Sequence, residues 1–545
     1  MSADPTSTPH TPVLIVGAGP AGLVLACDLA RRGIAHRLIE LDAADFAGAR
    51  GKGLQPRTQE VFEDLGLLDA VRAHGGPYPP MRAYRDGETV WEGRMDEIRE
   101  PTPDVPYPNA WMLPQWRTGE LLRDRLAALG GSVERGTALV SFTQDADGVT
   151  ALLRHSGGDG DSRPVLDEEV RTEEVRDEEV RADYLIGADG GRSTVRRTLG
   201  VGFAGETREE QRTFLADVRA DGLDRDHWHV WQPADPDQAR YALAMCPLAG
   251  TDTFQLTQGL PPDVPVPQAT LPELQQRVDA AAGAGRVRLT EVVWHSLYRA
   301  NMRMAERFRT GRVFLVGDAA HVHSPAGGQG LNTGVQDAYN LGWKLAAVLA
   351  GAPAGLLDSY EEERLPVAAD VLGISTRLHD KGVAGDADAH RRDDPVLHQL
   401  GLGYRGASLS REERTVPGPV TAGDRAPDAP GTGPHGEPVR LFDLFRGPHA
   451  TLLAFGEKAA TEAAALTASI PSGLRTVAIL SPGERPPAGI HPFTDTAAHA
   501  RTAYGPQSDG TLLLIRPDGY IGLTLDATPT AARHVLPYLS ATSRP

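Results

Sequence analysis

A glycine-rich turn between an apolar strand and a helix lies close to the N-terminus and constrains the fold more than any other segment. An apolar run over residues 13–16 precedes the turn, and we expect a helix over residues 21–32. In such a turn the first glycine permits the tight bend, the second lets the backbone approach a pyrophosphate, and the third lets the helix pack closely on the strand. The turn consists of Gly17, Ala18, Gly19, Pro20, Ala21 and Gly22. This pattern predicts a Rossmann-like unit that binds a dinucleotide at the N-terminus of the helix.

An acidic residue, Glu40, ends the second apolar run, which covers residues 36–39. At about 20 residues beyond the turn, a carboxylate is placed to accept hydrogen bonds from ribose hydroxyls. The same charge would repel a 2′-phosphate, so NADP is disfavoured in this crevice.

Two carboxylates further along the chain also follow buried strands. Asp189 comes after the apolar run 184–186, and Asp318 comes after the run 313–316. Ligands of open α/β sheets lie at the carboxyl ends of the strands, and Asp318 suits a polyol such as a ribityl chain. The glycine-rich run 327–332 then begins a long helix whose free N–H groups would face an anion. In this order the three segments predict FAD, bound along its whole length by one domain.

Family-type segments occur along almost the whole chain. They are residues 50–58, Gln115 with Glu120, the motifs at Asp189 and Asp318, and residues 360–364. With these segments the chain resembles the class A flavoprotein monooxygenases, the family of para-hydroxybenzoate hydroxylase. It is most similar to the longer bacterial branch that hydroxylates phenols and polycyclic aromatic polyketides. This chain has Ser324-Pro325 where many relatives have two consecutive prolines, and this difference widens the range of reactions that we consider.

The resemblance implies roles for individual residues. Arg50 and Gln115 would approach the flavin or its ribose, and Asp189 would belong to a motif shared by FAD and NADPH binding. Leu331 and Asn332 would meet the flavin ring. The full set of expected cofactor-binding residues is Gly17, Gly19, Pro20, Ala21, Gly22, Glu40, Arg50, Gln115, Asp189, Asp318, Gly330, Leu331 and Asn332.

The resemblance also implies a reaction. NADPH, or less readily NADH, would reduce FAD as a transient co-substrate, because residues 283–285 do not form a second nucleotide fingerprint. Reduced flavin and O₂ would form a C4a-(hydro)peroxyflavin, which hydroxylates a bulky phenolic or polycyclic aromatic substrate of the kind found in antibiotic biosynthesis. The oxygen chemistry belongs to the cofactor, while the protein excludes water and orients the substrate. We assign no catalytic residue and expect Pro325 and Gly328 to border the flavin.

Two alternative functions stay open at the level of sequence. One is a related flavin oxygenase that carries out epoxidation, Baeyer–Villiger insertion or oxidative decarboxylation. The other is a non-catalytic, flavin-bound protein that binds an unstable intermediate.

Composition excludes several classes of partner. The chain of 545 residues has a formal net charge of −18, which argues against nucleic acid and anionic membranes. With only Cys27 and Cys246, it has neither a disulfide framework nor a cysteine metal cluster. We read His321 and His323 as packing residues and expect no metal. No signal peptide or long apolar segment is visible, so we expect a cytoplasmic protein, compatible with a homo-oligomer.

The expected fold class is α/β with three parts: a Rossmann-like FAD-binding domain with a mixed sheet, an antiparallel β substrate domain, and, by resemblance, a thioredoxin-like C-terminal domain. The FAD domain would be discontinuous, over residues 11–75, 111–200 and 301–380. Residues 76–110 and 201–300 would form the substrate domain, 381–415 a helical connection, and 416–545 the C-terminal domain. In that last part we expect strand-like segments that include residues 441–445, and a hairpin turn at 516–519; it has no Cys-x-x-Cys, so dithiol chemistry is excluded.

Three tryptophans are candidates for the substrate pocket: Trp111, Trp228 and Trp231. On a strand, Trp228 would face opposite to His227 and His229, so at most one of these sets faces a ligand. A tandem pentapeptide over residues 168–181 matches neither the strand nor the helix period, and we expect it at a solvated hairpin tip.

Overall fold

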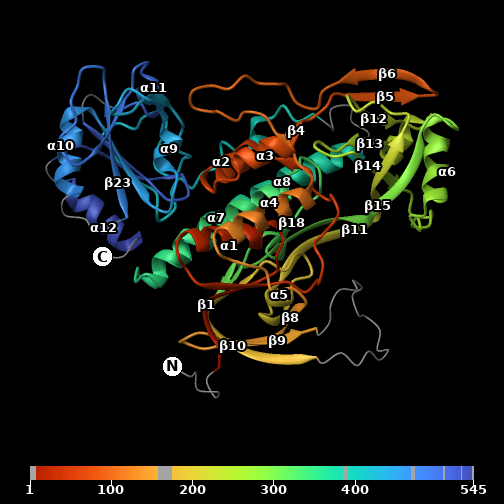
Figure 1. Ribbon diagram of the computed structural model, residues 1–545, viewed down its shortest axis with the longest axis horizontal. Helices are drawn as coiled ribbons and strands as arrows, with labels where there is room; N and C mark the ends of the chain where they lie inside the picture. Colours follow the sequence, from red (N-terminus) through yellow and green to blue (C-terminus); the bar gives the residue numbers. More distant parts are fainter. Residues whose placement is uncertain are drawn as a thin grey trace.

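The computed structural model of the chain describes residues 8–156, 175–383, 391–467, 473–506, 510–528 and 531–542. Within these ranges the strands form a seven-stranded sheet, two eight-stranded sheets and a small three-stranded sheet. Figure 1 shows the first large sheet beneath the central helices, the second on the side of α6, and the third in the blue C-terminal part.

The first sheet is the Rossmann-like part of the fold. Its main order is β16-β17-β10-β1-β2, with β8 and β9 joined to β10. The pairs of β1 with β2 and β10, and of β10 with β17, are parallel, as a doubly wound sheet requires. Its strands are β1 (His10–Val16), β2 (His36–Ile39), β8 (Thr137–Gln144), β9 (Val149–His155), β10 (Arg176–Gly187), β16 (Arg309–Thr310) and β17 (Val313–Leu315).

Helices cover this sheet, and helices and strands together supply the largest hydrophobic core. Helix α1 (Pro20–Arg31) packs against α7 (Gly330–Leu349), and side chains of both helices join the buried strand residues in one cluster. The other helices of the first 383 residues are α2 (Pro56–Asp64), α3 (Leu68–His74), α4 (Gln115–Ala128), α5 (Thr194–Thr198), α6 (Leu271–Ala282) and α8 (Asp358–Val383). The small sheet of β3 (Gly53–Leu54), β7 (Trp111–Met112) and β4 (Gly76–Pro77) lies next to them.

The second sheet forms a layer with α6 on its outer side (Figure 1). Its order is β18-β15-β11-β14-β13-β12-β5-β6, and all pairs are antiparallel except β12 with β5. That parallel pair differs from the expected antiparallel sheet, because β5 comes from the separate segment before residue 110. The strands are β5 (Met81–Arg85), β6 (Glu88–Gly93), β11 (Phe203–Asp221), β12 (Trp228–Trp231), β13 (Leu243–Pro247), β14 (Phe254–Leu260), β15 (Arg288–Ala305) and β18 (His321–Val322).

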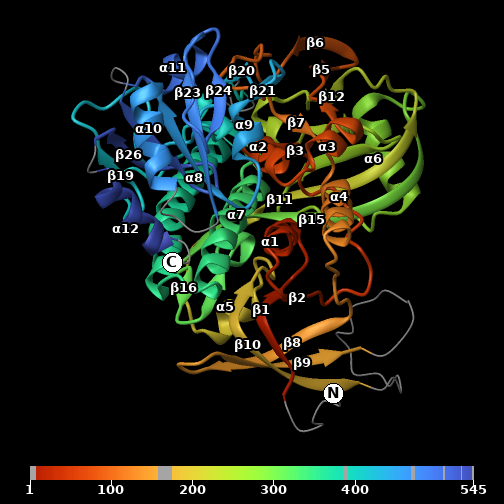
Figure 2. The same ribbon diagram turned by 60° about the vertical axis from the view of Figure 1, so that its left-hand side comes forward.

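The third sheet belongs to the thioredoxin-like C-terminal domain, which lies beside α7 and α8 (Figures 1 and 2). Its order is β19-β26-β25-β22-β23-β24-β20-β21, with β22, β23 and β24 parallel. The strands are β19 (Arg411–Glu413), β20 (Pro430–Thr432), β21 (Pro438–Arg440), β22 (Ala450–Phe455), β23 (Leu474–Leu480), β24 (His491–Thr494), β25 (Thr511–Ile515) and β26 (Ile521–Asp526). The helices are α9 (Leu441–Phe445), α10 (Gly456–Thr467), α11 (His499–Tyr504) and α12 (Ala532–Thr542). As predicted, residues 516–519 form the turn between β25 and β26.

Three expectations about local structure are wrong. Residues 441–445 are the helix α9, because Asp443 accepts a hydrogen bond from the Arg440 N–H at its start. The pentapeptide repeat follows the expected hairpin in that β9 and β10 are antiparallel, but its last copy lies within β10 with Val180 buried and not in a solvated tip; residues 168–174 of the repeat lie outside the described residues. The described part of 381–415 is mostly irregular beyond the end of α8, with one 3-10 turn (Pro395–His398) and β19, because glycines at 401, 403 and 406 disfavour a helix.

Candidate cofactor and substrate site

The turn after β1 has the geometry that a pyrophosphate needs. Gly17 adopts φ +103°, and a Cβ there would lie 2.5 Å from the Ala188 carbonyl oxygen. A Cβ on Gly22 would lie 2.0 Å from the Gly17 carbonyl oxygen, so the close packing of α1 on β1 requires glycine. At Gly19, by contrast, a Cβ would meet nothing within 4 Å. The second glycine therefore borders open space at the uncapped N-terminus of α1, where an anion is favoured.

Glu40 lies beside this turn. Its Oε2 accepts a hydrogen bond from the Ala18 N–H at 2.7 Å, and its Oε1 accepts one from the Asp42 N–H at 3.1 Å. The carboxylate thus fixes the turn and still has acceptor capacity for a ribose.

Asp189 has a role that the sequence did not reveal. Its Oδ2 accepts hydrogen bonds from the N–H groups of Thr194 (2.7 Å) and Val195 (3.1 Å), so it caps α5. Its Oδ1 is buried and has no hydrogen-bond partner among the described residues. That free oxygen is the part of Asp189 left for a ligand.

Asp318 follows β17 in a short 3-10 turn (Gly317–Ala319). The Asp318 side chain is exposed to solvent. The protein atoms around it nevertheless desolvate the carboxyl group and raise its pKa, while the charges of His321 and Arg50 oppose this rise. The carboxylate is thus accessible to a ligand in the turn that follows β17.

The N-terminus of α7 is organised by Asn332. Its Oδ1 accepts from the Gln55 N–H at 2.8 Å, and its Nδ2 donates to the carbonyl oxygens of Gly53 (2.9 Å) and Gly328 (2.8 Å). The Asn332 side chain therefore joins the segment 53–55 to the loop before α7. The N-terminus of α7 at Gly330 carries no side-chain cap, so its first N–H groups stay available to a ligand.

The segment 50–52 lies against this N-terminus. The Gly51 N–H donates to Gln115 Oε1 at 3.1 Å, and a Cβ on Gly51 would lie 3.6 Å from Leu331. Arg50 is exposed and lies over the Trp294 ring, 6.0 Å from its centroid. Pro325 and Gly328, which lie a few residues before Leu331 in the sequence, are exposed.

Three residues that the sequence analysis did not assign, Lys52, Asp217 and Gln255, meet the candidate Trp228 where the second sheet faces the FAD domain. Asp217 pairs with Trp294 on one neighbouring strand and with Gln255 on the other, so these three side chains share one face. Lys52 reaches this face from the flavin-side loop: its Nζ contacts Gln255 Oε1 and lies 4.4 Å from the centre of the Trp228 ring. We call Lys52, Asp217, Trp228 and Gln255 the roof cluster.

Asp217 is the most unusual member of the roof cluster. It is 2 % exposed, and neither carboxylate oxygen has a hydrogen-bond partner in the described part of the chain. Burial raises the pKa of Asp217 to about 6, although Lys52 and the Ala49 backbone lower it in part. Two signals could have found the cluster: Asp217 interrupts an apolar strand, and Lys52 is one of only four lysines.

The three candidate tryptophans lie in different surroundings. Trp228 lies on the inner face, in the roof cluster. Trp231 points to the opposite face and packs in the core beneath α6. Trp111 donates from Nε1 to the Val71 carbonyl oxygen at 3.1 Å and packs under Arg72. We therefore retain only Trp228 as a pocket candidate.

His321 and His323 form a buried pair. His321 Nε2 lies 2.6 Å from Asp337 Oδ2, and His321 Nδ1 lies 2.9 Å from His323 Nε2. Burial lowers the pKa of His323 to about 3, so this ring is neutral. Within the described ranges no three or more His, Cys, Asp or Glu side chains are grouped as metal ligands. The same ranges contain no helix with the length and apolar character to cross a bilayer.

Comparison with known proteins identifies the class. Residues 10–375 match the FAD binding domain family, and residues 420–539 match the aromatic-ring hydroxylase C-terminal domain. The chain therefore belongs to the family of FAD-dependent aromatic-ring hydroxylases, the class A flavin monooxygenases. It is an enzyme of this class, and the alternative of a non-catalytic flavin-bound protein is wrong.

Individual relatives cover nearly the whole chain. A flavin-dependent monooxygenase of Mycobacteroides abscessus is 45% identical over 532 residues, which cover 97% of this chain and 99% of that protein. A 6-methylpretetramide 4-monooxygenase of Streptomyces rimosus is 34% identical, over 96% of this chain and 94% of that one. The crystal structure of aklavinone-11 hydroxylase with FAD and aklavinone is similar with a TM-score of 0.78 at 29% identity, over 98% and 99% of the two chains.

Proposed function

We propose that this enzyme hydroxylates a bulky phenolic or polycyclic aromatic substrate with FAD, O₂ and NAD(P)H. The observation that carries the proposal is Lys52, which starts beside the flavin-side residues Gly51 and Leu331 and ends on the roof cluster. The Lys52 side chain thus connects the flavin-side loop with the second sheet, and a substrate would bind between these two parts. The relative named 6-methylpretetramide 4-monooxygenase and the hydroxylase structure that contains aklavinone support a substrate of this size.

Different residues of the chain would bind different parts of FAD. The open backbone at Gly19 and the N-terminus of α1 would bind the pyrophosphate, and Glu40 the adenosine ribose. Asp318 would accept hydrogen bonds from the ribityl hydroxyls, and the N–H groups at Gly330 would face the pyrimidine edge of the flavin. When bound, FAD supplies the transfer of electrons from NAD(P)H to O₂ and the activated oxygen.

The roof cluster would orient the substrate and favour its reactive form. A phenol is richer in electrons as its phenolate, and the Lys52 ammonium would stabilise that anion by its charge. Trp228 offers an aromatic face for a flat substrate and at the same time holds the ammonium by a cation–π contact. The sheet above excludes water from the oxygen transfer.

The experiment measures oxidation of NADPH and of NADH by the purified holoenzyme with a panel of phenols and polycyclic phenols under ¹⁸O₂. We expect substrate-stimulated oxidation and a product that carries one ¹⁸O atom. Lys52→Met should lower product formation on the order of a hundredfold, whereas Lys458→Met, which changes an exposed lysine of the C-terminal domain, should not. Unlabelled product, or a Lys52→Met enzyme as active as the wild type, would contradict the proposal.

Several finer points belong to the same proposal. Hydroxylation rather than epoxidation, Baeyer–Villiger insertion or decarboxylation follows from the phenolate argument. The product mass under ¹⁸O₂ separates decarboxylation, which loses CO₂, and NMR of the product distinguishes a new hydroxyl group from an epoxide or an inserted ester oxygen, which have the same mass. The domain boundaries given above stay proposed, although β15 and β18 continue the second sheet beyond residue 300, β4 pairs with β7 of the FAD-domain segment, and β19 joins the third sheet. A cytoplasmic location fits the use of NAD(P)H, and self-association stays a prediction for size-exclusion chromatography.

A further inference from the structure

A buried polar seam runs between α7 and α8. On α7 it contains Asp337, Asn340 and Lys344, each at most 1% exposed. Their spacing of three and four residues places them on one face of the helix. On α8 it contains Glu363 and Arg364, which are also buried. Charges in such a place are tolerated only when they are paired and hydrogen-bonded.

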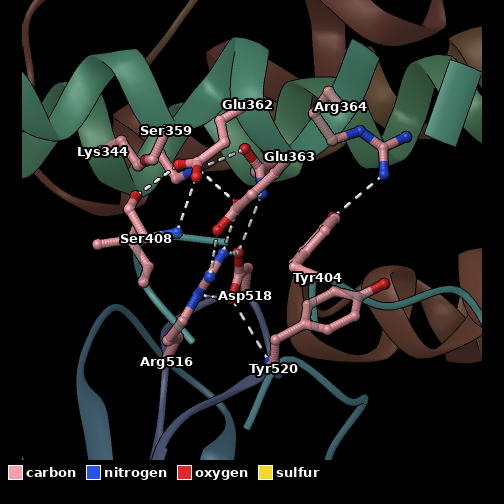
Figure 3. Close-up of polar contacts among 12 residues, drawn as sticks. Lys344, Ser359, Glu362, Glu363, Arg364, Tyr404, Ser408, Arg516, Asp518 and Tyr520 are labelled. Carbon is pink, nitrogen blue, oxygen red and sulfur yellow. Dashed lines mark hydrogen bonds and ion pairs between the residues drawn. The ribbon is translucent and has the colours of Figure 1, made fainter. Parts of the chain in front are cut away.

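The C-terminal domain completes this seam with its turn at residues 516–519. Arg516 donates two hydrogen bonds to Glu363, at 2.6 Å to Oε1 and 2.9 Å to Oε2. Lys344 Nζ donates to the same Oε2 at 2.7 Å. Glu363 Oε2 therefore accepts from both Lys344 and Arg516, and Oε1 accepts from Arg516. Asp518 accepts from Trp343 Nε1 at 3.0 Å. Figure 3 shows Arg516 between Glu363 and Asp518.

Arg364 extends the seam toward the start of α7. Its Nε donates to Asp337 Oδ1 at 2.7 Å, and its Nη2 donates to the Thr333 carbonyl oxygen, in the first turn of α7, at 3.2 Å. Its Nη1 donates to the Tyr404 hydroxyl at 3.1 Å (Figure 3). The Tyr404 ring lies 4.4 Å from the Tyr520 ring and 5.3 Å from the Arg516 guanidinium, so the C-terminal domain also holds Tyr404.

Asp337 connects the seam to the cofactor loop. Besides Arg364, it accepts hydrogen bonds at Oδ2 from the Gly317 N–H (3.1 Å) and from His321 (2.6 Å). Burial alone would raise the pKa of Asp337, but His321 and Arg364 bring it down to about 2, so the carboxylate stays charged. Gly317 directly precedes Asp318. A continuous buried chain of contacts therefore leads from Arg516 to the candidate ribityl contact.

We propose that Arg516 is a positioning residue for the cofactor site, supplied by the C-terminal domain. By completing the seam it fixes α8 and Tyr404, which hold Arg364 and Asp337 and thereby the loop that carries Asp318. This inference rests on the proposed contact between Asp318 and FAD. It assigns to the C-terminal domain a function beyond shielding: binding of FAD depends on its seating against α7 and α8.

The test is a double-mutant cycle on the dissociation constant of FAD, measured by flavin fluorescence at a temperature where circular dichroism shows every variant folded. The variants are Arg516→Gln, Asp318→Ala and the double variant. Arg440→Gln is the matched control, because Arg440 also pairs across the same two domains, with Glu63 on α2, but outside the seam. Tyr404→Phe, which removes only the hydroxyl held by Arg364, serves if Arg516→Gln does not fold.

We expect Arg516→Gln to weaken FAD binding about tenfold, and Tyr404→Phe in the same direction, with the control near the wild type. In the Asp318→Ala background the further loss should be less than about twofold, because the positioned contact is already absent. Arg516→Gln and Tyr404→Phe without effect, or losses that multiply with Asp318→Ala, would overturn the inference and leave the Asp318 assignment standing. Asp318→Ala that binds FAD normally would overturn both.

Discussion

At the scale of single residues, Asp217 combines three properties that are rarely found together. It is buried, it has no hydrogen-bond partner within the described residues, and Lys52 is close enough to influence its pKa. An unpaired buried carboxylate costs free energy whenever it is charged. In its charged form Asp217 therefore opposes folding.

We predict that Asp217→Asn stabilises the protein at alkaline pH. The folded-state pKa of about 6 lies above the usual value of 3.8, so between these values the folded state binds more protons and stability falls as the pH rises. The gain from Asn should be about 3 kcal/mol above pH 6 and vanish below about pH 4. Chemical denaturation from pH 4 to 8 measures it. Parallel pH profiles for the variant and the wild type would show that Asp217 is not held in this state.

At the scale of elements, the start of α1 separates two functions of glycine. Gly22 permits packing, because a side chain there would overlap the Gly17 carbonyl. Gly19 permits approach of a ligand, because its surroundings within the protein are open. Position along one helix turn thus decides whether a glycine supports the fold or the binding of the cofactor.

This separation predicts different losses for two similar variants. Gly22→Ala should lower the stability of the apoprotein by about 3 kcal/mol or more, through overpacking against β1. Gly19→Ala should leave the apoprotein as stable as the wild type but weaken FAD binding about tenfold, since the methyl group occupies the path of the pyrophosphate. Thermal melts of the apoproteins and flavin titrations distinguish the two. A destabilised Gly19→Ala apoprotein would contradict this assignment.

At the scale of the whole molecule, the seam unites the FAD domain with the C-terminal domain. Glu363 accepts hydrogen bonds from residues of both domains, and the pairing with Lys344 and Arg516 lowers its pKa to about 2 despite burial. Removal of one partner from a buried ion pair leaves the others uncompensated. The domains should therefore lose order together when this contact is broken.

We predict that Glu363→Gln destabilises the protein by about 3–5 kcal/mol. Hydrogen exchange should accelerate in α8 and in β25 and β26 at the same time. The adjacent Glu362→Gln is the control, because Glu362 is exposed and contacts Ser408 instead of the seam. Faster exchange confined to one of the two domains would show that the seam does not couple them.

The sequence by itself determined those features that depend on neighbouring residues. The turn from Gly17 to Gly22 follows from backbone sterics, and the positions of Asp189 and Asp318 at strand ends follow from apolar runs. The face taken by Trp228, opposite to His229, follows from the two-residue period of a strand. These patterns were sufficient to predict the Rossmann-like domain and the cofactor, whereas the class of reaction and the thioredoxin-like domain were implied by the resemblance to a known family.

Only the tertiary structure decided which distant residues meet. The register of β11 with β14 and β15 brings Asp217 beside Gln255 and Trp294, and the docking of a turn more than 150 residues away pairs Arg516 with Glu363. It also used Asn332 and Asp189 for internal hydrogen bonds that local patterns could not show. The physical reason is that the partner of a polar side chain depends on strand register and domain packing, whereas hydrophobic periodicity and glycine sterics act within a few residues.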